Sequence, residues 1–267
     1  MLITIKAVYN KNRAIVKRAY PTSFIVQRII GGIGAILFPI LIYLYIFQST
    51  TKHDFYQFTG TMDYITYVTI GVATNILSFS TLMNVGRCII SEIREGTLDT
   101  FLLSPASRIG YFIGAYLEQF VRSSFEFLVV LCVGAIFGAN LSINSTFFIV
   151  LIISSLAFFS VSIVLSSIMV MSRDTYLSQN TLVTLMSLLC GISFPPEYLP
   201  YTIKNISSIF PLTYAVSLIR KCLINNESLS LNLIILSKLI ISSVIFLFVG
   251  YFLYRKCEKE LIENIYS

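Results

Sequence analysis

The charged side chains that could do chemistry in this sequence are concentrated in one short segment. Glu92, Arg94, Glu95 and Asp99 lie there, in a chain of 267 residues that has only 13 acidic residues. The single histidine, His53, argues against a histidine-based metal or acid–base centre. The five cysteines include no C-x-x-C pair, so neither a zinc site nor a disulfide framework is indicated.

The motifs of nucleotide binding and hydrolysis are missing from the sequence. It contains no G-x-x-x-x-G-K-[ST] loop for phosphates, no G-x-S-x-G elbow and no H-E-x-x-H pair. We therefore expect no catalytic residue, no metal site and no cofactor in this chain.

A second charged group has helical spacing. Glu118, Arg122 and Glu126 follow one another at i, i+4 and i+8, so a helix would place them on one face. An ionised side chain at the centre of a bilayer costs roughly 2.5–3.5 kcal/mol on insertion scales, and neighbouring opposite charges relieve part of that cost. The group is either a neutralising ladder between helices, an ion or proton relay, or a site for a charged substrate group.

The composition predicts a membrane protein. The chain is 56% hydrophobic and 12% charged, about half the charged fraction of ordinary soluble domains, and its mean hydropathy is +0.81. A membrane-spanning helix needs about 20 mostly apolar residues. We predict an all-α integral membrane protein with one domain, 1–267, and six transmembrane helices, at 24–48, 62–86, 109–138, 146–171, 176–194 and 232–254.

The segments between the predicted spans indicate their orientation. Residues 1–20 read as an amphipathic helix in the membrane interface, or otherwise as a basic tail. Residues 195–231 contain four prolines and predict a re-entrant helical segment on the extracellular side. Basic residues concentrate at 1–20, at 87–108 and near the carboxyl terminus. The positive-inside rule therefore places the loop 87–108 and both termini in the cytoplasm. The net charge of +6 thus indicates membrane topology, and no nucleic-acid partner is expected.

The loop 87–108 has the pattern of two short helices. Cys88–Glu95 reads as a helix that ends at Gly96, which can supply a left-handed C-cap. Thr97 can then cap a second turn, which ends near Ser104 and Pro105. A stiff exposed elbow of this kind suits docking to another protein, although a loop that merely joins two spans would also fit.

Polar residues mark two of the predicted spans. A polar face on a membrane-spanning helix either lines a water-filled path or packs against neighbouring helices. On the second span they are Gly71, Thr74, Asn75, Ser78 and Thr81, and on the fifth they are Ser178, Gln179, Asn180, Thr181, Thr184 and Ser187.

Two motifs give the sequence a family resemblance. The run from Glu92 to Asp99, followed by Leu102-Leu103-Ser104-Pro105, resembles the E-x-x-x-G-T-L-[ED]…[ST]-P signature of ABC-2 type transporter permeases. The family's G-x-x-F-P…L-P…P-L-T-Y…R pattern is matched by Gly191, Phe194, Pro195, Leu199, Pro200, Pro211, Leu212, Thr213, Tyr214 and Arg220. With the six-span layout, the resemblance covers nearly the whole chain.

The resemblance implies the membrane half of an ATP-driven exporter. Two permease subunits, either two copies or this chain and a paralogue, would form the path, with the second and fifth helices lining it. Two separate ATPase subunits would bind ATP and magnesium. The loop would be the coupling helix, in which Glu92, Arg94, Glu95, Gly96, Thr97, Leu98 and Asp99 contact the ATPase.

The function expected from the sequence is thus that of a permease subunit in the cell membrane. Its expected cargo is an amphipathic small molecule, peptide, lipid or glycan. The alternatives are an ion-coupled secondary transporter that uses Glu118, Arg122 and Glu126, and a membrane scaffold without transport.

Overall fold

The helices of this chain were located in a computed structural model. The structure describes residues 1–19, 23–41, 45, 63–172, 181, 184–186, 188–192, 198–224 and 229–266. Their helices are α1 (Leu2–Ala19), α2 (Ser23–Leu41), α4 (Tyr64–Gly86), α5 (Cys88–Arg94), α6 (Leu98–Leu103), α7 (Arg108–Ile136), α8 (Ser145–Ser172), α10 (Tyr201–Ser207), α11 (Pro211–Ile224), η3 (Leu229–Asn232) and α12 (Leu233–Tyr266). No strand occurs among these residues, so the all-α prediction is confirmed for the part described.

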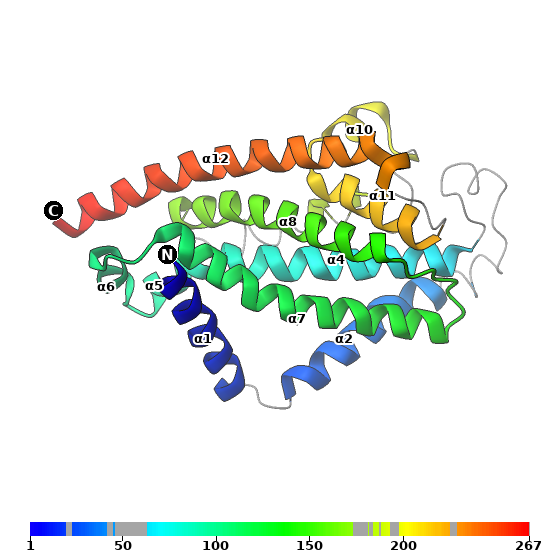
Figure 1. Cartoon of the computed structure of the whole chain (residues 1–267), viewed down its shortest axis with the longest axis horizontal. Coiled ribbons are helices and arrows are strands. Elements are labelled where there is room, and N and C mark those ends of the chain that lie inside the picture. Colours follow the sequence, from blue (N-terminus) through cyan, green and yellow to red (C-terminus); the bar gives the residue numbers. More distant parts are fainter. Residues whose placement is uncertain are drawn as a thin grey trace.

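Four long helices run side by side along the molecule (Figure 1). They are α4, α7, α8 and α12, whose apolar segments Tyr64–Gly86, Arg108–Ile136, Ser145–Ser172 and Leu233–Glu263 are each long and apolar enough to cross a membrane. They lie at four of the six predicted spans.

The other two predicted spans are only partly covered by the described residues. In the first, α2 holds a shorter apolar helix, Ile30–Leu41, and residues 42–44 and 46–48 lie outside the description. Most of the predicted span 176–194 also lies outside it. The count of six spans therefore stays a prediction, as does the placement of α1 in the membrane interface.

A sharp bend separates α10 from α11. The two helix axes differ in direction by 86°, the geometry of a broken span or a re-entrant loop. Two prolines mark the helix starts: Pro200 is the N-cap of α10, and Pro211 is the first residue of α11. Proline suits the first helical position because its missing N–H would have no partner there. Residues 195–197 and 225–228 of the predicted re-entrant segment lie outside the described residues.

The long helices differ greatly in their burial. In the most apolar window of α4, 78% of the residues are buried inside the chain, against 11% in α12. The fully buried side chains include Leu77 of α4, Phe127 of α7, and Phe158 and Leu165 of α8. Helix α4 is therefore the central helix, and α12 is peripheral, with apolar side chains suited to lipid.

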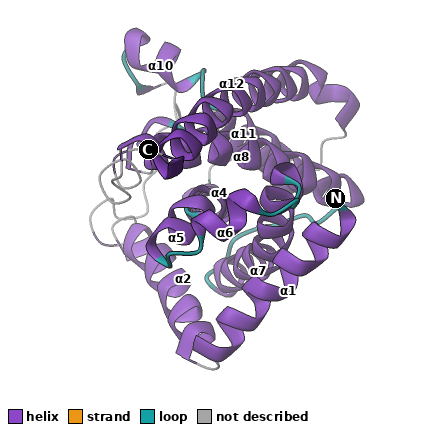
Figure 2. Cartoon of the chain, turned by 90° about the vertical axis from the view of Figure 1, so that its left-hand side faces the viewer, coloured by secondary structure: helices purple, strands orange, loops and turns teal. Residues whose placement is uncertain are grey.

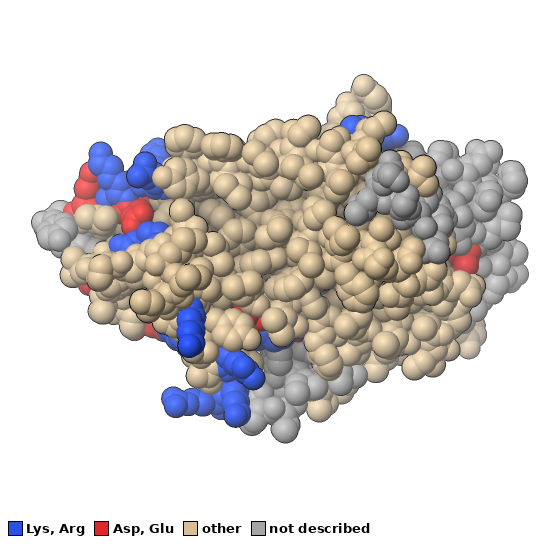
Figure 3. Space-filling view, viewed as in Figure 1, with Lys and Arg blue, Asp and Glu red and all other residues tan. Residues whose placement is uncertain are grey.

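Charge and chain ends are gathered at one end of the helix bundle. Both termini lie at the end that carries α5 and α6 (Figure 1), and α1, α5 and α6 cross this end when it is viewed face-on (Figure 2). Most of the visible lysine, arginine and acidic side chains also lie there, whereas the flank of the bundle has none over most of its length (Figure 3).

Helix α1 packs against the first turns of α7 through glycine. A Cβ atom on Gly114 would lie 2.8 Å from the carbonyl oxygen of Ile5 and 2.8 Å from Cβ of Val8, which is buried. Gly110, one turn earlier, faces Thr4 and the carbonyl of Met1 in the same way. Small residues four apart let two helices approach closely, and here they hold α1 at the charged end of the bundle.

We expect Gly114→Val to detach α1 from α7, because overpacking at such a contact costs about 1–3 kcal/mol. Trypsin cleavage within α1, at Lys11 and Arg13, should accelerate about fivefold or more. The matched control is Gly34→Val, since a Cβ at Gly34 meets nothing within 4 Å. Equal cleavage rates in the two variants would contradict this docking.

Candidate functional site

The turn between α5 and α6 is a glycine-capped helix end. Gly96 has φ of +69°, which glycine adopts without steric cost. The amide of Gly96 donates to the carbonyl of Ile93 at 3.2 Å, and the amide of Thr97 donates to that of Glu92 at 3.0 Å. These are the two hydrogen bonds of a Schellman motif, so the predicted left-handed cap at Gly96 is confirmed. A β-carbon on Gly96 would touch nothing within 4 Å, so the backbone conformation alone selects glycine.

Thr97 is the N-cap residue of α6, as predicted, but its side chain does not make the capping hydrogen bond. Its hydroxyl donates instead to carboxylate oxygen Oε2 of Glu92. The hydrogen bond to Glu92 fixes the direction of the Thr97 side chain, and in that position its oxygen accepts from no backbone amide at the start of α6.

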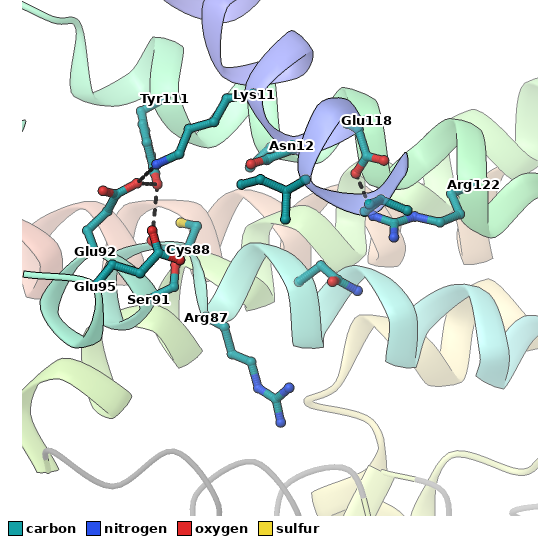
Figure 4. A pocket seen from close by; sticks show the side chains of 14 residues that line it. Lys11, Asn12, Arg87, Cys88, Ser91, Glu92, Glu95, Tyr111, Glu118 and Arg122 are labelled. Atoms are coloured by element: carbon teal, nitrogen blue, oxygen red, sulfur yellow. Dashed lines mark hydrogen bonds and ion pairs between the residues drawn. The ribbon is translucent and has the colours of Figure 1, made fainter. Parts of the chain in front are cut away.

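Glu92 is the point at which three parts of the chain meet. Its side chain is buried, and Oε1 accepts from Nζ of Lys11 in α1 at 2.5 Å and from the hydroxyl of Tyr111 in α7 at 2.6 Å. The carboxylate thus joins the loop to two other helices through Lys11 and Tyr111 (Figure 4), while Oε2 accepts from the hydroxyl of Thr97 within the loop. Glu92 thus holds the loop in place from inside, while its predicted contact with an ATPase stays a prediction.

The electrostatics of Glu92 favour its charged form. Burial acts to raise the pKa of this carboxyl group, but hydrogen bonds from Lys11, Thr97 and Tyr111 outweigh it, so the pKa of Glu92 lies below its ordinary value of 4.5. The network is therefore ionic at neutral pH, and its strength depends on the negative charge.

The other end of the loop is held by Arg108. Its guanidinium donates to the carbonyl oxygens of Leu102 at 2.7 Å, Phe101 at 3.0 Å and Ala106 at 3.1 Å. Its Nε atom also donates to Glu258 of α12 at 2.6 Å. Arg108 therefore closes the carboxyl end of α6 and connects the loop to the carboxyl-terminal helix.

The tip of the loop faces outward. Arg94, Glu95, Gly96, Thr97 and Asp99 are exposed, Leu98 is half-buried, and Leu103 is 68% exposed. The tip thus presents charges of both signs beside an apolar side chain, a composition suited to a protein contact.

A cavity of about 240 Å³ lies beside the Glu92 network. Its wall is formed by α1, α4, α5 and α7, together with the residues that flank α5, Arg87 and Glu95. It carries three basic residues (Lys11, Arg87 and Arg122) and three acidic residues (Glu92, Glu95 and Glu118). Figure 4 shows the Glu118–Arg122 pair at one end of this cavity and Glu92 at the other.

The predicted ladder on α7 has its acidic members inside the protein. Arg122 donates to Glu118 at 2.6 Å, and Glu126 accepts from the hydroxyl of Ser80 in α4 at 3.1 Å. Glu118 and Glu126 are buried. Glu118 and Arg122 also belong to the cavity wall, so the pair is both an ionic contact within one helix and a charged boundary of the cavity.

The polar face of the second predicted span is turned largely into this chain. Gly71, Thr74, Ser78 and Thr81 are buried, and Asn75 is half-buried. The hydroxyls of Thr74 and Thr81 donate to carbonyls of their own helix, Ile70 at 2.8 Å and Leu77 at 2.9 Å. On the fifth predicted span Thr181 and Thr184 are exposed, while Ser178, Gln179, Asn180 and Ser187 lie outside the described residues. A translocation path along these faces stays a prediction.

The proline-containing motif converges on Arg220 at the opposite end of α4. The buried guanidinium of Arg220 donates to the carbonyls of Gly191 at 2.5 Å and Ile192 at 2.7 Å. It also lies 3.5 Å from the ring centre of Tyr67 in α4, a cation–π contact. A β-carbon on Gly71 would lie 2.6 Å from this guanidinium.

Other residues of that motif shape the bend. Thr213 donates from its hydroxyl to the carbonyl of Ser207 at 2.7 Å, and Tyr214 donates to that of Ser208 at 2.8 Å. Both bonds join α11 to the end of α10. Pro200 and Pro211 begin the two helices, while Phe194 and Pro195 lie outside the described residues.

Sequence reasoning did not identify several residues that build this site. Lys11 and Tyr111 bind Glu92, and Tyr67 supports Arg220. Their partners are distant in sequence, so no local pattern indicates them. The glycine pair on α7 does have a sequence signal, the small-x-x-x-small spacing.

Comparison with known proteins shows that one family model covers both the loop and the bent helix pair. The family model of ABC-2 type transporters matches residues 11–224, a range that includes the loop α5–α6 and the bent pair α10–α11. Two curated relatives, from Escherichia coli strain K12 and E. coli O157:H7, are each named probable multidrug ABC transporter permease YbhR. Each is 21% identical over 175 residues, which cover 64% of this chain and 47% of the relative. The chain thus spans about half the length of these relatives.

We expect Glu92→Gln to destabilise the protein by about 1–3 kcal/mol at neutral pH, because the hydrogen bonds lose their charged acceptor. The pKa of Glu92 is lower in the folded protein than in the unfolded chain. The charged form therefore stabilises the fold above the unfolded-chain pKa, near 4.5, and this contribution is lost as the pH falls through the folded-state pKa.

Unfolding of the detergent-purified chain, followed across this pH range, measures the effect. The variant should show a smaller loss of stability on acidification than the natural sequence. Glu95→Gln, an exposed neighbour on the same loop, is the control and should change little. Identical pH profiles for Glu92→Gln and the natural sequence would contradict the ionic network.

Proposed function

Because the chain belongs to the ABC-2 type transporter family, we propose that it is the permease subunit of an exporter whose α5–α6 loop receives motion from a separate ATPase. Permeases of this family are membrane subunits of ABC transporters and carry no ATPase domain of their own. The present chain also lacks a P-loop motif. ATP and magnesium would therefore be bound by the partner subunit.

One observation carries the proposal: the exposed tip of the loop is attached to three other helices. Glu92 connects it to α1 and α7, and Arg108 connects it to α12. Helix α5 also follows α4 after a single residue. A force on Arg94, Glu95 or Asp99 would thus reach four helices through short, charge-assisted contacts. Coupling is reciprocal, so cargo should alter ATP turnover as ATP alters access to the path.

The proposed assembly has two permease subunits, either two copies or this chain and a paralogue, above two ATPase subunits in the cell membrane. The relatives' name refers to multidrug transport, and many large apolar side chains are exposed on the described part of the chain. Both features favour an amphipathic cargo. Of the predicted classes, an amphipathic small molecule is the first to test.

The proposal is tested by purifying the tagged full-length chain with the subunits that accompany it. We expect an ATPase to copurify and to show cargo-dependent activity in proteoliposomes. Transport that follows a proton or sodium gradient without ATP would favour the rival ion-coupled carrier that uses Glu118, Arg122 and Glu126. Such transport would overturn the proposal.

We expect Gly96→Val to reduce cargo-stimulated ATP hydrolysis about fivefold or more. Valine in a left-handed conformation costs about 1–2 kcal/mol, which would displace the exposed tip. Gly96→Asn is the control, since asparagine tolerates this conformation. Membrane insertion and elution should stay unchanged in both variants. Normal coupling in Gly96→Val would count against the loop as the ATPase contact.

We also expect both termini to lie in the cytoplasm, on the side of the loop. They lie at the same end of the bundle as α5 and α6 (Figure 1), where the basic residues are concentrated. A reporter fused after Ser267 should be active only in the cytoplasm. Activity outside the cell would reverse the orientation and remove the loop from reach of a cytoplasmic ATPase.

A further inference from the structure

A groove on the flank of the bundle runs between α7, α8 and α12. Two adjoining cavities form it, of about 580 Å³ and about 340 Å³, and they share Phe159 and Leu247 on their walls. The larger cavity is lined almost wholly by apolar side chains, among them Leu117 of α7, Leu156 of α8 and Val244 of α12. All three are exposed, so the groove is open to the surrounding lipid.

The smaller cavity lies at the charged end of the bundle and contains basic groups. Arg108 on its wall forms an ion pair with Glu258, with 2.6 Å between Nε and Oε1. Arg255 on the same wall is exposed, and its guanidinium carbon lies 5.3 Å from the ring centre of Tyr251. It has no carboxylate or carbonyl partner in the part of the chain that the structure describes. The groove therefore ends in one positive charge that the described residues do not neutralise.

The length of the groove matches one leaflet of a bilayer. From Arg255 to Ile240, the most distant α12 residue on its wall, the helix rises about 22 Å. Half of a bilayer including its headgroups measures about 20–22 Å. A lipid whose phosphate lies at Arg255 would thus have its acyl chains along the apolar walls, and these chains would end near the bilayer midplane.

We propose that the α7–α8–α12 groove binds an anionic phospholipid. Its phosphate contacts Arg255, and one acyl chain lies along the apolar wall formed by Leu117, Leu156 and Val244. Charge complementarity at one end and an uncharged wall elsewhere favour this occupant over a soluble anion, which the apolar part would not contact. The headgroup site borders the Arg108–Glu258 ion pair, so a bound lipid adjoins the contact that ties the loop to α12.

A tryptophan reporter can test this site, because the natural sequence contains no tryptophan. Tyr251→Trp places the reporter on the groove wall, whereas Phe252→Trp places it on the next residue, which is 67% exposed and belongs to neither cavity wall. Each full-length variant is reconstituted in phosphatidylcholine vesicles. These contain a small fraction of either phosphatidylglycerol or phosphatidylcholine that is brominated near the top of its acyl chains.

We expect brominated phosphatidylglycerol to occupy the site beside Tyr251→Trp about fivefold more than brominated phosphatidylcholine, the effect of one basic side chain near an anionic headgroup. The Phe252→Trp reporter should show no preference. Adding Arg255→Gln should abolish the preference, and adding Lys256→Gln, a neighbouring exposed cation, should preserve it. Monodisperse elution confirms that each variant is folded.

Three outcomes would overturn the proposal. Equal quenching by both lipids at Tyr251→Trp would show that headgroup charge is not recognised. Shielding of this reporter from both lipids would show that protein, such as a second copy of the chain, covers the groove. Loss of the preference on adding soluble glycerol phosphate would show a site for a free phosphate group.

Discussion

The buried carboxylate of Glu92 is the constraint on which the charged end of the molecule depends. A carboxylate removed from water costs several kcal/mol unless donors replace its hydration. Lys11, Thr97 and Tyr111 supply those donors from α1, the loop and α7. If one of these elements moves away, the charge loses part of its compensation. The geometry of the exposed tip is therefore a property of three elements together.

A second buried charge, of opposite sign, has a similar role at the far end of α4. The guanidinium of Arg220 is compensated by the carbonyls of Gly191 and Ile192 and by the ring of Tyr67. Tyr67 lies near the start of α4, and α5 with Glu92 follows its end. The most buried long helix thus connects the two sites, and under the proposed function it is the packed route by which motion of the loop would reach the bent pair α10–α11.

Local sequence was informative where the chemistry is local. Gly96 predicted the left-handed cap because few other residues adopt that conformation without strain. Apolar run lengths located the four long helices, since a bilayer demands about 20 apolar residues. Thr97 occupies the predicted N-cap position of α6, but its side chain is turned to the buried carboxylate of Glu92 and makes no capping hydrogen bond. The burial of Glu92 was likewise not evident from its neighbours in the sequence.

By itself, the sequence determined that this is a membrane protein, that its fold is all-α, and to which family it belongs. These follow from composition, from run length and from short motifs, which are properties of neighbouring residues. Only the tertiary structure decided that Glu92 is buried while Glu95 is exposed, and that Arg108 and Arg220 tie distant segments together. A charge in a weakly polar interior is stable only beside its partner, and the partner's position is set by how the helices pack.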